Sequence, residues 1–396
     1  MSENTATENR FLIPALFISQ LSTRPIGILM GFILTDIALT YNTTIGNAGQ
    51  IVTAASLAGM LVAPFLAALS IKYKPRTLLL TGITLITVSA LGCSYAPNYI
   101  SMLIFYSIGG LGASMVTPMI ITIIGEKISE EKQSGTIGLI MASTPMLSTV
   151  AGLTIAFVLS RGWQTAFQVY VFPIILLSLI IAYIALPKTT SSESLQPRKT
   201  GIREGFRQIA GHRSALACLL GTTFSMIAWG GIIWYIVSFY QQTYGVSTAT
   251  VGIIWSANTF IYVIGSLLCG RIIPKIGVKR MTSISSLFIG ISIAFFTNIP
   301  NYYLAIGFGL LMPLFASFWS ASSNTLSLRQ VPEYRGAMMS LNSGSSLLGR
   351  ALGSAIGGLS LNIGGYSLMG YVMGVFGLLA FLAVSTMVKD PSLEIE

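Results

Sequence analysis

Apolar positions along the chain gather into long runs that short polar intervals separate. These runs predict twelve helical spans, at residues 12–38, 45–69, 78–94, 99–125, 136–159, 165–186, 215–240, 250–269, 281–297, 302–328, 337–361 and 367–388. Most of them reach about 20 residues, the length that a helix needs to cross the hydrocarbon core of a bilayer. We therefore predict an all-α polytopic membrane protein with twelve transmembrane helices.

Composition and charge support this interpretation. Of the 396 residues, 53% are hydrophobic and 9% are charged, whereas about a quarter are charged in an ordinary soluble domain. The formal net charge of +10 would indicate a nucleic-acid partner in a soluble protein. Successive spans cross the membrane in opposite directions, so alternate intervals between them lie on the same side. Of the 22 basic residues, 19 fall in the intervals of one side. Loops on the cytoplasmic side are the ones enriched in Lys and Arg. We expect a multi-pass plasma-membrane protein with both termini in the cytoplasm and no nucleic-acid partner.

One long polar interval divides the chain into two sets of six spans. The predicted parts are an N-terminal six-helix bundle (1–187), a cytoplasmic linker (188–213) and a C-terminal six-helix bundle (214–396). An offset of 203 residues superimposes equivalent loop positions of the two bundles: Lys72 and Lys275, Arg76 and Lys279, Gly162 and Gly365. Six plus six related spans form the parallel, pseudo-two-fold repeat of many secondary transporters.

The interval after the eighth span carries a recognisable motif. It reads Gly270-Arg-Ile-Ile-Pro274-Lys275-Ile-Gly277-Val-Lys279 and resembles the loop G-x-x-x-D-R-x-G-x-R/K of the major facilitator superfamily, with Pro274 at the acidic position. The resemblance covers essentially the whole chain. It implies a monomeric secondary transporter that works by alternating access, with gating loops that contain Lys72, Arg76, Lys275, Gly277 and Lys279.

The first two spans contain segments that are similar to two different branches of that superfamily. Residues 34–38, 49–54 and 63–64 resemble the drug and sugar efflux branch, which implies an exporter driven by proton antiport. Arg24-Pro25, followed by Gly31 and Leu34, is similar to the first helix of the cyanate permease group. That second resemblance favours an uptake or exchange carrier for a small organic or inorganic anion, and the sequence leaves both functions open.

Three ionisable side chains lie inside predicted spans. Arg24 and Arg350 fall near the midplane, and Asp36 lies near the outer interface. A charge at the midplane costs on the order of 3 kcal/mol, so it should face a cavity or a partner. Each arginine is either a packing residue or a solute-binding cation, and Asp36 is either an interfacial carboxylate or the proton-coupling group. Two cations without an anion favour an anionic or neutral solute over a cationic one.

Other polar and small residues in the spans complete the prediction. Asn258 and Tyr262 are four residues apart and share a helical face, so we add them to Arg24 and Arg350 as candidate substrate-binding residues. A stripe of small residues, which lets helices approach closely, is predicted for packing. It consists of Gly349, Gly353 and Gly357.

The remaining chemistry argues against an enzyme. The chain has no phosphate loop of the form G-x-x-x-x-G-K-[ST], and its single histidine, His212, lies in a polar interval. Cys93, Cys218 and Cys269 lie in or at the edge of apolar runs, which predicts neither disulfides nor a metal site. We expect no cofactor and no metal, and the expected partners are a small-molecule solute, protons or a counter-solute, and the lipid bilayer.

Overall fold

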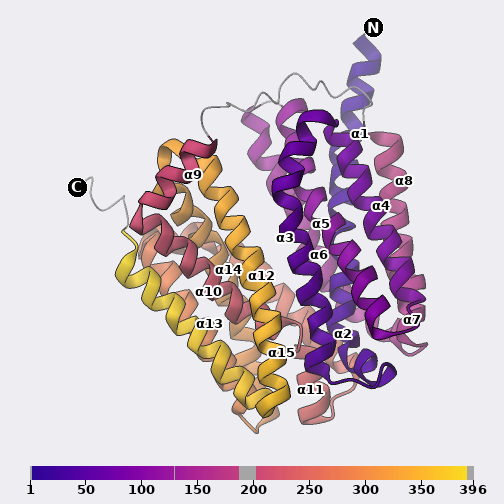
Figure 1. The fold of residues 1–396 in the computed structure, drawn as a ribbon, viewed down its shortest axis with the longest axis vertical. Helices are drawn as coiled ribbons and strands as arrows, with labels where there is room; N and C mark the ends of the chain where they lie inside the picture. The colour runs from indigo at the N-terminus through magenta and orange to yellow at the C-terminus, as the bar shows by residue number, and fades with distance from the viewer. Residues whose placement is uncertain (1, 129, 187–201, 390–396) are drawn as a thin grey trace. The chain divides into compact units, whose positions relative to one another are not determined.

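The helical architecture follows from what a backbone can do in lipid. The computed structural model describes residues 2–128, 130–186 and 202–389, and regular structure in these ranges is helical (Figure 1). Hydrocarbon offers no partner to backbone N–H and C=O groups, so a spanning segment must pair them internally. Eleven described helices are long and apolar enough to cross a membrane, and the longest, Ala337–Met387, has 51 residues and contains two spans. The predicted twelve-helix fold is therefore confirmed.

Apart from the interval between α8 and α9, the helices follow one another with short connections. In chain order they are α1 (Ser2–Leu21), α2 (Pro25–Thr40), α3 (Ile45–Lys72), α4 (Pro75–Ser94), α5 (Tyr99–Lys127), α6 (Glu130–Leu159), α7 (Trp163–Ala166), the π-helical turn η1 (Phe167–Val171), α8 (Phe172–Ala185), α9 (Ile202–Gly211), α10 (Arg213–Ile233), α11 (Ile236–Tyr244), α12 (Thr248–Ile276), α13 (Val278–Asn298), α14 (Tyr302–Gln330), the short η3 (Pro332–Tyr334), α15 (Arg335–Leu382) and η4 (Ala383–Met387). Residues 188–201 of the predicted linker lie outside the described residues, and its residues 202–211 form α9.

The helices group into two compact units. Unit 1 comprises Met1–Asp36 and Ala54–Gln196, and unit 2 comprises Ile37–Thr53 and Pro197–Glu396. Within unit 1, α4 packs against α5 and α8, and α1 packs against α6 and α8 (Figure 1). Within unit 2, α10 packs against α15, and α13 and α12 pack against α14. The end of α2 and the start of α3 thus belong to unit 2.

The first span, predicted over residues 12–38, is present at Phe11–Thr40, but its helix is interrupted. The helix α1 ends at Leu21 and α2 begins at Pro25, because proline has no N–H and disfavours the helical conformation of the residue before it. Carbonyls before the break accept both backbone N–H groups and hydroxyls: Ser19 O accepts from Ser22 N (3.3 Å) and Ser22 Oγ (2.7 Å), and Gln20 O accepts from Thr23 N (3.3 Å) and Thr23 Oγ1 (2.8 Å). Ser178 Oγ of α8 lies 3.0 Å from Ile18 O. Irregular backbone is tolerated in a span where such partners exist.

Two further breaks occur in unit 2. The predicted span 215–240 divides into α10 and α11, with Trp234 and Tyr235 between them. The helix α15 contains non-helical backbone at Gly364 (φ −139°, ψ 20°) and Gly365 (φ 68°, ψ −165°). The positive φ of Gly365 needs a residue without a Cβ atom, and this turn separates the last two spans.

Several helices extend beyond the predicted span ends. The helix α3 ends at Lys72 instead of residue 69, and α12 ends at Ile276 instead of residue 269. Helical hydrogen bonding continues beyond the hydrocarbon core because the long stem of Lys carries its charge to water. The polar interval after α3 therefore shrinks to Tyr73 and Lys74, and the interval after α12 shrinks to Gly277.

The glycine stripe of α15 packs against α10, which confirms the predicted close approach. A Cβ atom on Gly353 would lie 2.6 Å from Ile227 O and 2.8 Å from Gly231 N. At Gly357 it would lie 2.7 Å from Gly231 O. These separations are shorter than van der Waals contact, so the two backbones touch with no room for a side chain.

We predict that Gly353→Ala lowers the free energy of unfolding by about 1–3 kcal/mol, because the added methyl group overpacks the α10–α15 contact. Gly344→Ala on the same helix is the matched control, since a Cβ atom there meets nothing within 4 Å. That control should be neutral or stabilising, as alanine is the better helix former. Thermal unfolding of both variants in detergent checks the prediction, and equal melting temperatures would contradict it.

Candidate functional site

Predicted substrate-binding residues come together in unit 2. Arg350 lies on α15, where it is partly buried. Its backbone is close to α10, because a Cβ atom on Gly230 would lie 3.0 Å from Arg350 Cα. Tyr262 of α12 interacts electrostatically with the Arg350 guanidinium. The fold thus brings an arginine and a phenol from two different spans within electrostatic range.

Asn258 lies one helical turn before Tyr262 on α12 and is partly buried. Its side-chain nitrogen donates to Ile254 O at 3.0 Å, so that donor is used within the helix. Residues four apart share a face, and the Asn258 carbonyl oxygen is therefore carried on the face of Tyr262.

Trp319 of α14 carries a buried polar group in unit 2 that the sequence analysis did not include among the candidate residues. Its side chain is 5% exposed, and within the described part of the chain its indole Nε1–H has no hydrogen-bond partner. A buried donor without a partner costs about 1–3 kcal/mol. An oxygen atom of a bound solute would remove that cost. The signal in the sequence was a tryptophan in the middle of a long apolar span.

Arg24 lies in unit 1, at the break of the first span. Its side chain is exposed, and its carbonyl oxygen accepts the N–H of Ile28 at 3.0 Å, which is the first helical bond of α2. Arg24 is therefore the residue that directly precedes α2, at the end of the helix where the helix dipole is also positive. Gln20, just before the break, is buried and accepts a hydrogen bond from Thr117 Oγ1 of α5 at 3.2 Å. Half-helix N-termini inside membranes commonly point at anionic groups of solutes.

Asp36 lies near the end of α2. Its side chain is exposed, one helical turn before the last helical residue, Thr40. An exposed carboxylate at a helix end can exchange protons with water. The position fits both interpretations of Asp36, and its role stays a prediction.

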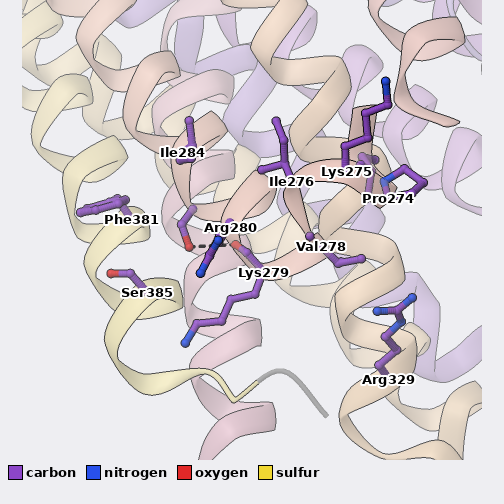
Figure 2. Close-up of a pocket in the computed structure, with 13 residues that line it drawn as sticks. Pro274, Lys275, Ile276, Val278, Lys279, Arg280, Ile284, Arg329, Phe381 and Ser385 are labelled. Atoms are coloured by element: carbon purple, nitrogen blue, oxygen red, sulfur yellow. Dashed lines mark hydrogen bonds between the residues drawn. The ribbon is translucent and has the colours of Figure 1, made fainter. Parts of the chain in front are cut away.

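The predicted gating residues fall at the junctions α3–α4 and α12–α13. In unit 1, Lys72 Nζ lies 5.6 Å from the ring centre of Tyr73, and Arg76 Nη2 donates to Tyr183 O at 2.6 Å. In unit 2, the residues predicted for gating line a cavity of about 710 Å³, which Figure 2 shows. They are Lys275, Gly277 and Lys279.

A polar cluster in unit 2 joins the start of α3 to α15, and we call it the Ser354 cluster. Thr53 Oγ1 lies 2.8 Å from Ser354 Oγ, and Tyr235 OH donates to Ser354 O at 3.1 Å. Two amide contacts flank it: Gln50 Nε2 to Ala355 O at 3.3 Å, and Asn362 Nδ2 to Asn47 Oδ1 at 2.9 Å. The sequence analysis did not include these residues in the site, because their contacts depend on tertiary structure.

The fold and the residues described above can be compared with known protein families. The sequence model of the Major Facilitator Superfamily matches residues 12–230 and 218–395. The chain belongs to the major facilitator superfamily. It is a secondary transporter of small solutes and not an enzyme.

Relatives of the transporter include bacterial proteins of the same family. The uncharacterized MFS-type transporter YbcL of Bacillus subtilis (strain 168) is 24% identical over 336 residues, which is 83% of each chain. YvkA of the same organism, also uncharacterized, is 26% identical over 166 residues, or 41% of this chain and 37% of its own. The niacin transporter NiaP of Acinetobacter baylyi is 27% identical over 154 residues, or 39% of this chain and 35% of its own. This transporter thus aligns with little more than a third of the length of YvkA and NiaP.

Solved structures share the fold at low sequence identity. A D-xylose-proton symporter superposes with a TM-score of 0.77 at 16% identity and covers 96% of this chain and 97% of its own. A bacterial homologue of the human lysosomal transporter Spinster, in an inward-facing and unoccupied conformation, has a TM-score of 0.76 at 15% identity, with 98% and 99% coverage. At these identities the likeness establishes the fold.

Proposed function

We propose that this transporter carries a small organic solute with an anionic group by alternating access, and that Arg350 binds that group. The observation that supports the proposal is the partly buried Arg350 on α15, within electrostatic range of Tyr262. A guanidinium binds a carboxylate through two parallel hydrogen bonds, which are stronger than bonds between neutral groups. The phenol of Tyr262 supplies a further donor.

The charges of the spans argue for the same solute class. Arg24 and Arg350 are the basic residues within the predicted spans, and Asp36 is the only acid there. An arginine in a span repels a cationic solute, while a neutral solute would still find hydrogen-bond donors. The relative NiaP is named a niacin transporter, and niacin is a carboxylic acid, which is consistent with this choice.

Export by proton antiport is the direction that the efflux-like segments favour, with Asp36 as the proton-coupling group. Asp36 is exposed near the end of α2, where a proton can reach it from water. The charge bias of the loops further supports a plasma-membrane location with both termini in the cytoplasm.

Uptake or exchange of a small anion is the second candidate. The observation in its favour is Arg24, which lies at the broken first span beside the N-terminus of α2. Guanidinium and helix dipole together make that position attractive to an anion.

We predict that Arg350→Gln lowers transport of nicotinate more than tenfold, since a hydrogen bond to a charged group contributes about 1.5–3 kcal/mol. Transport of nicotinamide, which has the same ring and no charge, should change less than twofold. Flux of both labelled compounds into proteoliposomes is the measurement. Arg161→Gln, in the loop between α6 and α7, is the control and should leave both fluxes unchanged. Equal losses for both compounds in Arg350→Gln would indicate a structural arginine.

Alternating access gives the Ser354 cluster a role. If α3 moves as one rigid helix when the bundles rock, its start leaves α15, because α3 continues into unit 1 at Ala54. The bonds of the Ser354 cluster must then break and re-form in every cycle.

A disulfide across the Ser354 cluster should therefore arrest transport. In a background with Cys93, Cys218 and Cys269 replaced by Ser, the pair Thr53→Cys and Ser354→Cys should lose flux when oxidised and regain it when reduced. Ser225 Oγ of α10 and Ser286 Oγ of α13 are 2.9 Å apart within unit 2, so Ser225→Cys with Ser286→Cys is the matched control and should stay active. Undiminished flux in the oxidised Thr53 and Ser354 pair would exclude this movement.

A further inference from the structure

A sharp turn between α12 and α13 creates a cavity in unit 2. Gly277 takes a φ of 91°, which favours glycine, and α13 begins at the next residue. The cavity, of about 710 Å³, lies among the end of α12, the first two turns of α13, Arg329 of α14, Phe381 of α15 and Ser385 of η4. Figure 2 shows Lys279 and Arg280 between Phe381 and Ser385 on one side and Arg329 on the other.

The lining of this cavity is strongly basic. Four of its residues are cationic, and among the lining residues, all in the described ranges, none is acidic: the cations are Lys275, Lys279, Arg280 and Arg329. At the acidic position of the superfamily motif the chain has Pro274, so that position supplies no counter-charge. The cavity thus concentrates positive charge without a carboxylate in its wall.

The position of two of these cations on their helix adds a second argument. Lys279 and Arg280 are the second and third residues of α13. Cations in the first turn of a helix are disfavoured, because the helix dipole is positive there. An anion in the cavity would relieve the repulsion among the side chains and pair with the dipole at the same time.

Apolar side chains share the cavity with the cations. Ile276 and Ile284 are exposed, and Phe381 is partly buried in the last turn of α15. This end of unit 2 is the one that the charge bias predicts to face the cytoplasm, where the leaflet carries anionic lipids. A phospholipid fits both parts of the lining, with its phosphate beside the cations and an acyl chain along the isoleucines and the phenylalanine.

A cavity at the start of α4, in the first repeat, is less basic. That cavity, of about 600 Å³, has Arg76 as the basic residue among its lining residues, and Arg76 already donates to Tyr183 O. The offset of 203 residues pairs Arg76 with Lys279 and Thr77 with Arg280. The two cavities thus share part of their lining positions, and the cluster of cations lines the one in unit 2.

We propose that the cavity at the α12–α13 turn binds the phosphate headgroup of an anionic phospholipid. Basic pockets between transmembrane helices on the cytoplasmic side are suited to such headgroups. The site is separate from Arg350, and it is independent of which solute the transporter carries.

Native mass spectrometry of the full-length protein in detergent tests this proposal with palmitoyl-oleoyl phosphatidylglycerol as the probe. Replacing Lys275, Lys279 and Arg280 together by Gln should weaken its binding at least tenfold. The matched control replaces Lys72, Lys74 and Arg76 of the first repeat by Gln and should bind within twofold of the wild type. Ser385→Glu, which adds a carboxylate at a partly buried position of the lining, should also weaken binding and does not depend on the triple variant folding.

Three outcomes would overturn the proposal. Equal losses in the two triple variants, or no loss in either, would show that binding follows overall charge or lies elsewhere. Phosphatidylcholine with the same acyl chains, bound as tightly as phosphatidylglycerol, would remove the preference for an anion. Displacement of phosphatidylglycerol by equimolar inorganic phosphate or glycerol phosphate would assign the cavity to a free anion instead of a lipid.

Discussion

The structure depends on the requirement that every backbone polar group inside hydrocarbon has a partner. Twelve helical spans meet this requirement along most of the chain, and the interruptions meet it by other means. At the break before α2, carbonyls at the end of α1 accept both turn N–H groups and the hydroxyls of Ser22 and Thr23. Because such breaks need partners, they occur at defined places, and one of them carries Arg24. The one charged residue at the break before α2 is Arg24, which is therefore held at a fixed place in the first span.

Positive charge is the second feature that sets this chain apart. Several of its cationic residues lie at helix N-termini or inside a membrane span, where a positive charge is disfavoured. Arg24 lies at the N-terminus of α2, Arg350 lies within a span of α15, and Lys279 and Arg280 lie in the first turn of α13. On the account proposed above, an anion at each of these places would offset part of that positive charge. A carboxylate of a solute and a phosphate of a lipid would satisfy the same physical need at two different depths.

Much of the fold could be predicted from the sequence, because the length and spacing of apolar runs reflect bilayer thickness directly. The packing role of the glycine stripe around Gly353 could also be predicted, since small residues repeated every four positions in a membrane helix are typical of a close helix–helix contact. The broken first span was missed although Arg24-Pro25 carried the signal, because the apolar run continues on both sides of the pair. The proximity of Arg350 to Tyr262 and the contact of Thr53 with Ser354 depend on tertiary packing, which periodicity along a single chain does not encode.

The most direct test of the central claim, that the spans hold a cationic site for an anionic solute, is a thermal-shift comparison on the unmodified purified protein. A ligand that binds the folded state raises the melting temperature, and the shift grows with the logarithm of its concentration relative to its Kd. Small carboxylates at a fixed concentration should raise the melting temperature more than their amides, and quaternary ammonium compounds should leave it unchanged. A larger shift with a quaternary ammonium compound than with any carboxylate would contradict the account.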